Sequence, residues 1–229
     1  MQEFVKQIFR ATSNQEDMQE SSLGFHGDQY LLNILDPLLD DTDVFVETGT
    51  NVGQTLRYVA DRYPHLELYS CEPDTKSFSQ AADALDDISR AHLYEMTSQD
   101  FLPEIVSKIK TSPVCWLDAH GDGFKWPLRY EIEYLTNHLE MGYLVVDDFK
   151  VPGEPQFGYD EYDGQVCSMS YIEDCFASGH KYTVIYPTYE VRTSNHHPLR
   201  GYAIICIDTG SDAIPSQLLE NNYTVTSLL

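Results

Sequence analysis

Apolar runs alternate with amphipathic segments along the middle of the chain. Short apolar runs predict five strands, at 43–47, 66–71, 91–95, 114–118 and 143–147. Apolar residues at helical spacing between and after them predict four helices, at 54–63, 75–85, 102–109 and 128–139. This alternation predicts right-handed βαβ units, and therefore a parallel sheet covered by helices on both faces.

The two ends of the chain follow other patterns. Residues 1–40 are predicted to be helical, with an apolar stripe formed by Leu31, Leu32, Ile34, Leu35, Leu38 and Leu39. Residues 151–169 are rich in Gly, Pro, Tyr and Asp and predict a long irregular insert, followed by a helix at 171–177. Strands at 182–186 and 202–207 are expected to pair in a hairpin-like way and to give the sheet, of seven strands in all, an antiparallel edge.

The charge of the chain limits its partners. Its 37 acidic and 14 basic residues give a formal net charge of −23. A surface this negative repels nucleic acid and anionic lipid, so we expect no nucleic-acid partner and no membrane partner. We interpret the charge as a solubility or salt adaptation rather than as a device for attracting cationic substrates.

Other features of composition predict a cytoplasmic protein. No apolar stretch approaches the roughly 20 residues that span a bilayer, and the first residues lack the pattern of a secretory signal. The five cysteines show no CxxC spacing, which is typical of a reducing compartment. A homo-oligomer is compatible with the sequence.

The strongest local motif is a glycine-containing turn directly after the first predicted strand. It reads Glu47-Thr48-Gly49-Thr50-Asn51-Val52-Gly53 and opens a helix. The first strand-to-helix turn of an open α/β sheet is a common ligand site, and its glycines permit a sharp turn and close approach. The glycine spacing is GxxxG rather than GxGxxG, which disfavours a nicotinamide dehydrogenase.

A second acid, Glu72, ends the second predicted strand, 25 residues after Glu47. An acid at this position can accept hydrogen bonds from both hydroxyls of a ribose. The alternative is that Glu72 only caps the following helix.

Together these motifs resemble the class I S-adenosylmethionine-dependent methyltransferases. Three further motifs follow in the same order: Ser98–Pro103, Cys115–Asp118, and Val145–Asp148 with Pro152-Gly153 after it. The ordered set, over about 43–153, resembles the metal-dependent small-molecule O-methyltransferases, which include catechol and sugar O-methyltransferases. The resemblance implies one Rossmann-like methyltransferase domain over 1–229, with an N-terminal helical cap (1–40), a cofactor-binding half (43–148) and an acceptor-side half (149–229).

The resemblance also implies roles for individual residues. The methionine end of S-adenosylmethionine would be held by Glu47, Gly49, Thr50, Asn51 and Gly53. The ribose would be held by Glu72, and the adenine would lie at Ser98 and Gln99. Asp118 would also lie against the cofactor.

Asp118, Asp147 and Asp148 follow two strands that we expect to be neighbours. Their carboxylates would then converge on one crevice and repel one another unless a cation lies among them. Oxygen ligands of this kind suit Mg²⁺, or Mn²⁺ in its place. The alternative is that Asp147 or Asp148 caps a turn before Pro152, and that only Asp118 is functional.

The acceptor side departs from the catechol-type pattern. Gly121 stands where those enzymes carry a lysine, so we expect a sugar or diol hydroxyl rather than a catechol as acceptor. His120 is the candidate general base, with a pKa near 6.5, or else a substrate-positioning residue, and Lys125 is a more distant candidate. A metal-independent methyltransferase and a non-catalytic cofactor-binding protein remain alternatives.

Several other polar residues have weaker cases. His26 could cover the cofactor or be a surface histidine. Tyr159 and Tyr162 could form a lid or an oligomer contact. Arg192, His196 and His197 could touch an acidic substrate or belong to a solvated loop.

Overall fold

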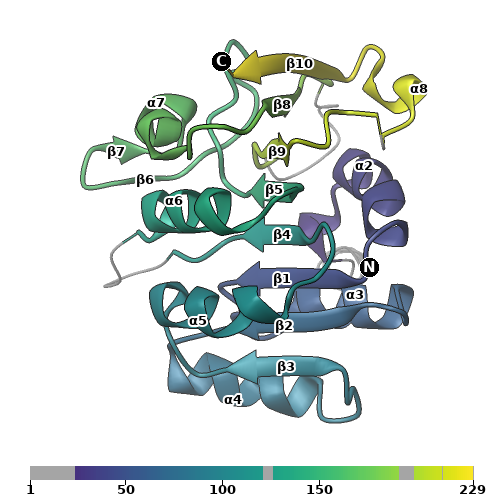
Figure 1. Cartoon of the computed structure of the whole chain (residues 1–229), viewed down its shortest axis with the longest axis vertical. Coiled ribbons are helices and arrows are strands. Elements are labelled where there is room, and N and C mark those ends of the chain that lie inside the picture. Colours follow the sequence, from purple (N-terminus) through teal and green to yellow (C-terminus); the bar gives the residue numbers. More distant parts are fainter. Residues whose placement is uncertain (1–23, 121–125, 191–198, 213, 229) are drawn as a thin grey trace, which may run out of the picture.

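A twisted eight-stranded sheet forms the centre of the computed structural model, which describes residues 24–120, 126–190, 199–212 and 214–228 (Figure 1). Within these residues the strand order is β10-β8-β9-β5-β4-β1-β2-β3. The strands of this sheet are β1 (Val44–Thr48), β2 (Glu67–Cys71), β3 (Ala91–Tyr94), β4 (Val114–Leu117), β5 (Gly142–Val146), β8 (Tyr182–Pro187), β9 (Ala203–Ile207) and β10 (Tyr223–Leu228).

Five strands are parallel, as the alternating pattern predicts, and β4 and β5 are neighbours as expected. β1 pairs with β2 and β4, β2 with β3, and β4 with β5, all in parallel. On the other side, β5–β9, β9–β8 and β8–β10 are antiparallel pairs. The expected mostly parallel α/β sheet and the antiparallel pairing of the last two predicted strands are therefore confirmed.

The predicted number of seven strands is wrong because β10 forms an eighth. β10 reads Tyr-Thr-Val-Thr-Ser-Leu, and most of it is exposed, so it has no apolar run to reveal it. The antiparallel edge also differs in detail. β9 lies inside the sheet between β5 and β8, and β10 occupies the edge.

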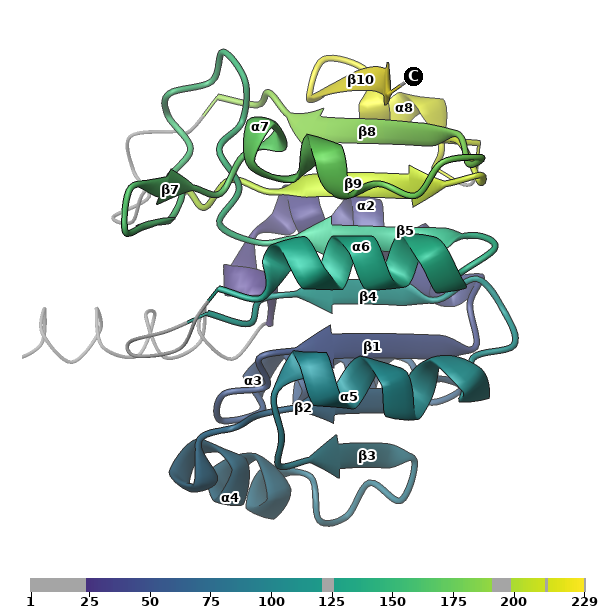
Figure 2. The ribbon, with the colours of Figure 1, turned by 60° about the vertical axis from the view of Figure 1, so that its left-hand side comes forward.

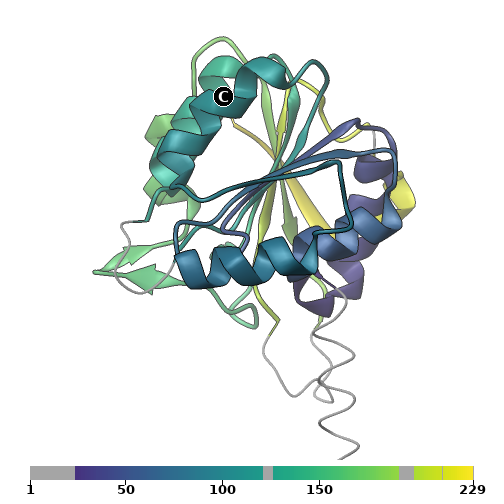
Figure 3. The ribbon, with the colours of Figure 1, turned by 90° about the horizontal axis from the view of Figure 1, so that it is seen from below.

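Helices cover both faces of the sheet, as expected. They are α2 (Gln29–Asp40), α3 (Gln54–Arg62), α4 (Thr75–Ala84), α5 (Ser98–Ile105), α6 (Leu128–His138), α7 (Met169–Ile172) and α8 (Ser216–Leu219). Figure 2 shows α5, α6 and α7 in front of the sheet with α2 and α3 behind it, and Figure 3 shows the two layers end-on. Among the described residues, no helix combines the length and apolarity needed to cross a bilayer.

The predicted helices agree with the structure to within a few residues, with two differences. The helix expected at 102–109 begins at Ser98 and ends in a 3-10 turn (Val106–Lys108). The helix expected at 171–177 is only the short α7 followed by a 3-10 turn (Glu173–Cys175). The irregular insert at 151–169 contains a small hairpin of β6 (Glu161–Tyr162) and β7 (Gln165–Val166).

The N-terminal part begins, within the described residues, with a short turn (Phe25–Gly27) that leads into α2. Asp28 caps α2 by accepting hydrogen bonds from the N–H groups of Tyr30 and Leu31, at 2.9 and 3.2 Å. All six residues of the predicted stripe are buried against the sheet, as expected. The rest of the predicted 1–40 helical cap, residues 1–23, lies outside the described residues.

Candidate active site

The glycine-containing turn after β1 is held against the ends of the neighbouring strands. The N–H groups of Gly49 and Thr50 both donate to the carbonyl oxygen of Cys71, at 3.0 Å each. Gly49 has φ +84°, and a Cβ at this position would lie 2.4 Å from the backbone oxygen of Asp118. The turn therefore needs glycine for its conformation and for its close approach to the end of β4.

Glu47 supports this turn from inside the protein. Its Oε2 accepts a hydrogen bond from Ser70 Oγ at 2.7 Å, and Ser70 also contacts Thr50 through their hydroxyls. Burial raises the pKa of Glu47 to about 8, so the carboxyl group is protonated at neutral pH. Its contact with the methionine end of a cofactor stays a prediction.

Glu72 lies between the turn and the start of α4. Its two carboxylate oxygens accept hydrogen bonds from the N–H groups of Asn51 and Asp74, at 2.8 Å each. The cap of α4 is Asp74, which accepts from the N–H of Ser77. The alternative role of Glu72 as the helix cap is therefore wrong, and its carboxylate is held at the carboxyl ends of β1 and β2.

Ser98 and Gln99 form the first turn of α5, after β3. Ser98 is buried, and the carbonyl oxygen of Gln99 accepts a hydrogen bond from the hydroxyl of Tyr130 on α6 at 3.2 Å. The carboxyl ends of the parallel strands meet along this edge. The structure therefore brings Ser98 and Gln99 to the same edge as the turn and Glu72.

Glu131 is a buried acid that the sequence analysis missed. It is 1% exposed, on α6, and neither its Oε1 nor Thr48 Oγ1 has a hydrogen-bond partner among the described residues. Burial raises the pKa of Glu131 to about 7, although nearby Ser98 and Thr48 lower it. Its helical position gave no sign of this, because acids on amphipathic helices usually face solvent.

The three predicted aspartates lie at the ends of two adjacent strands, as expected. The N–H of Asp118 donates to the carbonyl of Thr48, and the N–H of Asp147 donates to the carbonyl of Leu117, at 3.0 and 3.1 Å. Burial and then the neighbouring Asp147 raise the pKa of Asp118. The crowded carboxylates are thus a costly arrangement in the absence of compensating positive charge.

The structure divides these aspartates into two groups, each with a histidine. One group is His26, Asp118 and Asp147, and the other is Asp118, His120 and Asp148. In each group one ligand atom per residue lies within 4.8 Å of the others, and Asp118 belongs to both. From the sequence we expected a single cluster of three carboxylates, with no histidine among the ligands.

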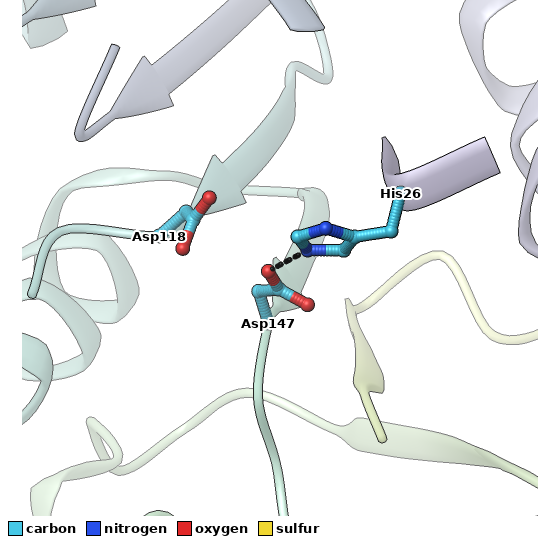
Figure 4. A group of neighbouring side chains, drawn as sticks. All are labelled: His26, Asp118 and Asp147. Atoms are coloured by element: carbon cyan, nitrogen blue, oxygen red, sulfur yellow. Dashed lines mark hydrogen bonds and ion pairs between the residues drawn. The ribbon is translucent and has the colours of Figure 1, made fainter. Parts of the chain in front are cut away.

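His26 lies at this cluster, beside the ends of β4 and β5. Its Nε2 is 2.6 Å from Asp147 Oδ2, and Figure 4 shows the imidazole directed at that carboxylate with Asp118 alongside. The hydrogen bond that His26 donates to the Asp147 carboxylate raises the pKa of His26 to about 9, against the opposing effect of burial. His26 is therefore a histidine at the surface whose ring is held by Asp147, and a contact with the cofactor stays a prediction.

His120 faces a second set of acids. Its Nε2 lies 2.9 Å from Asp118 Oδ1 and 3.2 Å from Asp148 Oδ2, without the geometry of a hydrogen bond. Burial lowers the pKa of His120, but Asp118 and Asp148 together raise it to about 10. The predicted pKa near 6.5 is therefore wrong for this charge environment, in which the imidazole is protonated.

The insert closes over His120. Tyr162 Oη lies 3.1 Å from His120 Nδ1 and donates to Asp160 Oδ2 at 2.8 Å. Arg200 Nη1 lies 3.1 Å from Asp148 and 3.0 Å from Asp160, so Asp148 is tied to the insert rather than serving only as a turn cap.

Aromatic side chains extend this side of the site. Trp126 packs edge-on against Tyr162, with ring centres 5.6 Å apart, and stacks on Tyr171 at 5.1 Å. Tyr159 is exposed, and the Lys150 ammonium lies over its ring. Five other residues named above lie outside the described residues: Gly121, Lys125, Arg192, His196 and His197.

Comparison with solved structures shows which fold this is. The chain is similar to the O-methyltransferase from Bacillus cereus in complex with SAH, with a TM-score of 0.55, 15% identity, and coverage of 84% of this chain and 89% of that one. It is also similar to spermidine synthase from Thermotoga maritima, with a TM-score of 0.53, 17% identity, and coverage of 86% and 66%. Cofactor-bound Rv0187 from MTB gives a TM-score of 0.51, 14% identity, and coverage of 79% of both chains.

Sequence comparison adds no assignment. No protein-family profile matches the chain, and no curated protein matches it. At such low identity the structural likeness establishes the fold alone. The chain therefore has the Rossmann-like α/β fold of methyltransferases, as its motifs predicted.

Two glycines with left-handed backbones give a matched test of the close approach at the turn. Gly49→Ala combines an unfavourable φ with a clash against Asp118 and is expected to lower the free energy of unfolding by at least about 2 kcal/mol. Gly153 has φ +81°, and a Cβ added there would meet nothing within 4 Å, so Gly153→Ala is expected to cost about 1 kcal/mol. Urea unfolding of both variants measures the difference, and equal losses would contradict the steric argument.

Glu131 is expected to make stability depend on pH. Its pKa is raised from 4.5 to about 7 in the folded protein, so its contribution is full below about pH 4.5 and is lost as the pH rises toward 7. Glu131→Gln removes this loss, which amounts to about 3 kcal/mol. Urea unfolding across this pH range should therefore show a flatter profile for the variant.

Glu133→Gln is the matched control, because Glu133 is exposed on the same helix. Its profile should follow the wild type. If the free energy of unfolding of the wild type falls no more with rising pH than that of Glu131→Gln, the assignment of this pH dependence to Glu131 is refuted.

Proposed function

We propose that the protein transfers a methyl group from S-adenosylmethionine to a hydroxyl of a small molecule, a sugar or a diol, with assistance from a divalent metal ion. The observation that carries the proposal is the contact between the glycine-containing turn and the acidic cluster. Gly49 packs directly on the backbone of Asp118, so a ligand on the turn would lie beside the carboxylates. The proposed cofactor site and the acidic cluster would thereby share one edge of the sheet.

The residues around the turn suit S-adenosylmethionine. Glu72 keeps a carboxylate at the ends of β1 and β2, where it can accept hydrogen bonds from ribose hydroxyls. Ser98 and Gln99 lie farther along the same edge, where we propose that the adenine binds. The positively charged sulfonium would face the aspartates, which favour it electrostatically.

The acidic cluster suits a divalent cation. Its carboxylates are buried or half-buried, and they face only His26, His120 and Arg200 as positively charged partners among the described residues. Asp118, Asp147 and Asp148 are the residues we propose to hold Mg²⁺ or Mn²⁺. A cation bound there would lower the pKa of an acceptor hydroxyl and fix its direction.

The chain's own residues would then position the acceptor. The aromatic group of Trp126, Tyr162 and Tyr171 offers flat apolar faces beside the acids, and such faces suit the C–H surfaces of a sugar ring. The acceptor oxygen would form a bond to the methyl carbon as the carbon–sulfur bond breaks, leaving S-adenosylhomocysteine. His120 is placed to take the hydroxyl proton once the negative charge around it is compensated.

Cofactor binding is the first test. Calorimetric titration with S-adenosylmethionine should show micromolar binding, and Glu72→Ala should weaken it at least tenfold through loss of the ribose contact, a change of about 1.4 kcal/mol or more. Glu67→Ala is the matched control, since Glu67 is a half-exposed acid on β2, the strand that precedes Glu72, and faces His92. Failure of the wild-type protein to bind S-adenosylmethionine would overturn the proposal.

Metal dependence is tested by activity on diols and sugars, followed as formation of S-adenosylhomocysteine. A chelator should reduce kcat/KM at least about tenfold, with recovery on adding Mg²⁺ or Mn²⁺, and Asp118→Asn should cause a similar loss. Activity that survives the chelator would instead support the metal-independent alternative. Cofactor binding with no product from any acceptor would support the non-catalytic one.

A further inference from the structure

The turn that carries His26 has an unusual backbone. Gly24, Phe25, His26 and Gly27 are consecutive and have φ values of 61°, 47°, 56° and 68°. Two of these residues carry side chains in the left-handed region, where the Cβ crowds the following carbonyl oxygen. Such a conformation persists only where the surrounding structure enforces it.

Anchors on both sides of His26 enforce it. Phe25 is 1% exposed and packs edge-on against Trp116, with ring centres 4.9 Å apart. A Cβ at Gly24 would lie 2.8 Å from Cβ of Tyr58, so the turn fits closely against α3. After His26, Asp28 caps α2 and accepts a hydrogen bond from Tyr189. The backbone position of His26 is therefore fixed by contacts of the residues on either side of it.

The anchored turn directs a half-exposed imidazole at buried carboxylates. The side chain of His26 is 49% exposed, so packing does not explain its placement, whereas the side chain of Asp147 is 2% exposed. Figure 4 shows His26 approaching from the N-terminal turn, while Asp118 and Asp147 come from the ends of β4 and β5. The three groups thus converge from separate elements.

We propose that His26 is a direct metal ligand, together with Asp118 and Asp147. This inference rests on the proposed function, which supplies the metal ion, and it adds a histidine to the proposed carboxylate ligands. Ligand atoms within 4.8 Å of one another match the span of one coordination shell, in which ligands lie about 2.0–2.2 Å from the ion. Asp148, buried and ion-paired through Oδ1 with Arg200 at 3.1 Å, adjoins the same cluster through His120.

His120 belongs to the acceptor side in this arrangement. It contacts Tyr162 and lies 3.6 Å from Asp160 through Nδ1, so the insert holds it. The ring of His26, by contrast, contacts the carboxylate of Asp147 and lies beside the ring of Trp116, both of which belong to the sheet side of the site.

An imidazole ligand changes which ion the site selects. Mg²⁺ prefers oxygen ligands throughout, whereas Mn²⁺ and the later divalent transition metals bind nitrogen more readily. The site is therefore expected to prefer Mn²⁺ over Mg²⁺, and His26 is expected to be the source of that preference.

Electron spin-echo spectroscopy on the metal-free full chain loaded with Mn²⁺ alone tests the ligand directly. The wild type should show coupling of Mn²⁺ to a directly bound ¹⁴N nucleus. His26→Gln should abolish that coupling, whereas His120→Gln and the exposed control His92→Gln should retain it. Absence of the coupling in the wild type, its retention in His26→Gln, or its loss in His120→Gln would each overturn the proposal.

Metal affinity supplies a second readout. His26→Gln should weaken Mn²⁺ binding at least about tenfold and change Mg²⁺ binding far less, since only the nitrogen contact is lost. Equal losses for both ions would overturn the proposal, and thermal unfolding of the variant checks that the turn is intact. Titration with S-adenosylmethionine separates the two hypotheses. Failure to bind S-adenosylmethionine overturns the methyltransferase proposal. A ¹⁴N coupling of Mn²⁺ that depends on His26 would still establish His26 as a metal ligand in that case.

Discussion

The close contact between the turn after β1 and the end of β4 is the constraint on which the site depends. Gly49 has no room for a side chain because the backbone of Asp118 lies against it. The same turn is tied to β2 through the carbonyl of Cys71 and to Glu72 through the N–H of Asn51. A single glycine thereby fixes the distance between the proposed cofactor residues and the acidic cluster.

The buried acids in the site are compensated in different ways. Burial raises the pKa of Glu47 and of Glu131 into the neutral range. Asp147 and Asp148 are about as deeply buried, but His26 and Arg200 provide positive charge beside them. Glu47 and Glu131 therefore act mainly as hydrogen-bonding groups, and the cost of burying charge falls on the aspartates that are proposed to bind a cation.

Much of the parallel half could be predicted because its sequence agrees with its structure at every level. The apolar runs, the glycine-containing turn and the acids after β2, β4 and β5 all lie where the pattern places them. β10 could not be predicted in this way, because an exposed edge strand needs no apolar run. Glu131 was missed for the opposite reason, since a charged residue on a helix gives no sign that it faces inward.

His26 illustrates a different limit, because its position depends on a left-handed turn that only its flanking Gly24 and Gly27 suggest. That turn is held by the contact of Phe25 with Trp116, on a strand about 90 residues later in the chain. The packing of the turn on the sheet therefore determines which groups the imidazole contacts.

The two sides of the site therefore have different origins. The ends of the parallel strands supply the turn, Glu72 and the three aspartates. Segments outside the parallel strands supply His26, Tyr162 and Arg200, and backbone hydrogen bonds from Asp160 to Asp148 and from Cys167 to Asp160 hold the insert in place. Because these segments surround the acids on the acceptor side, choice of metal and acceptor would be set by them rather than by the fold.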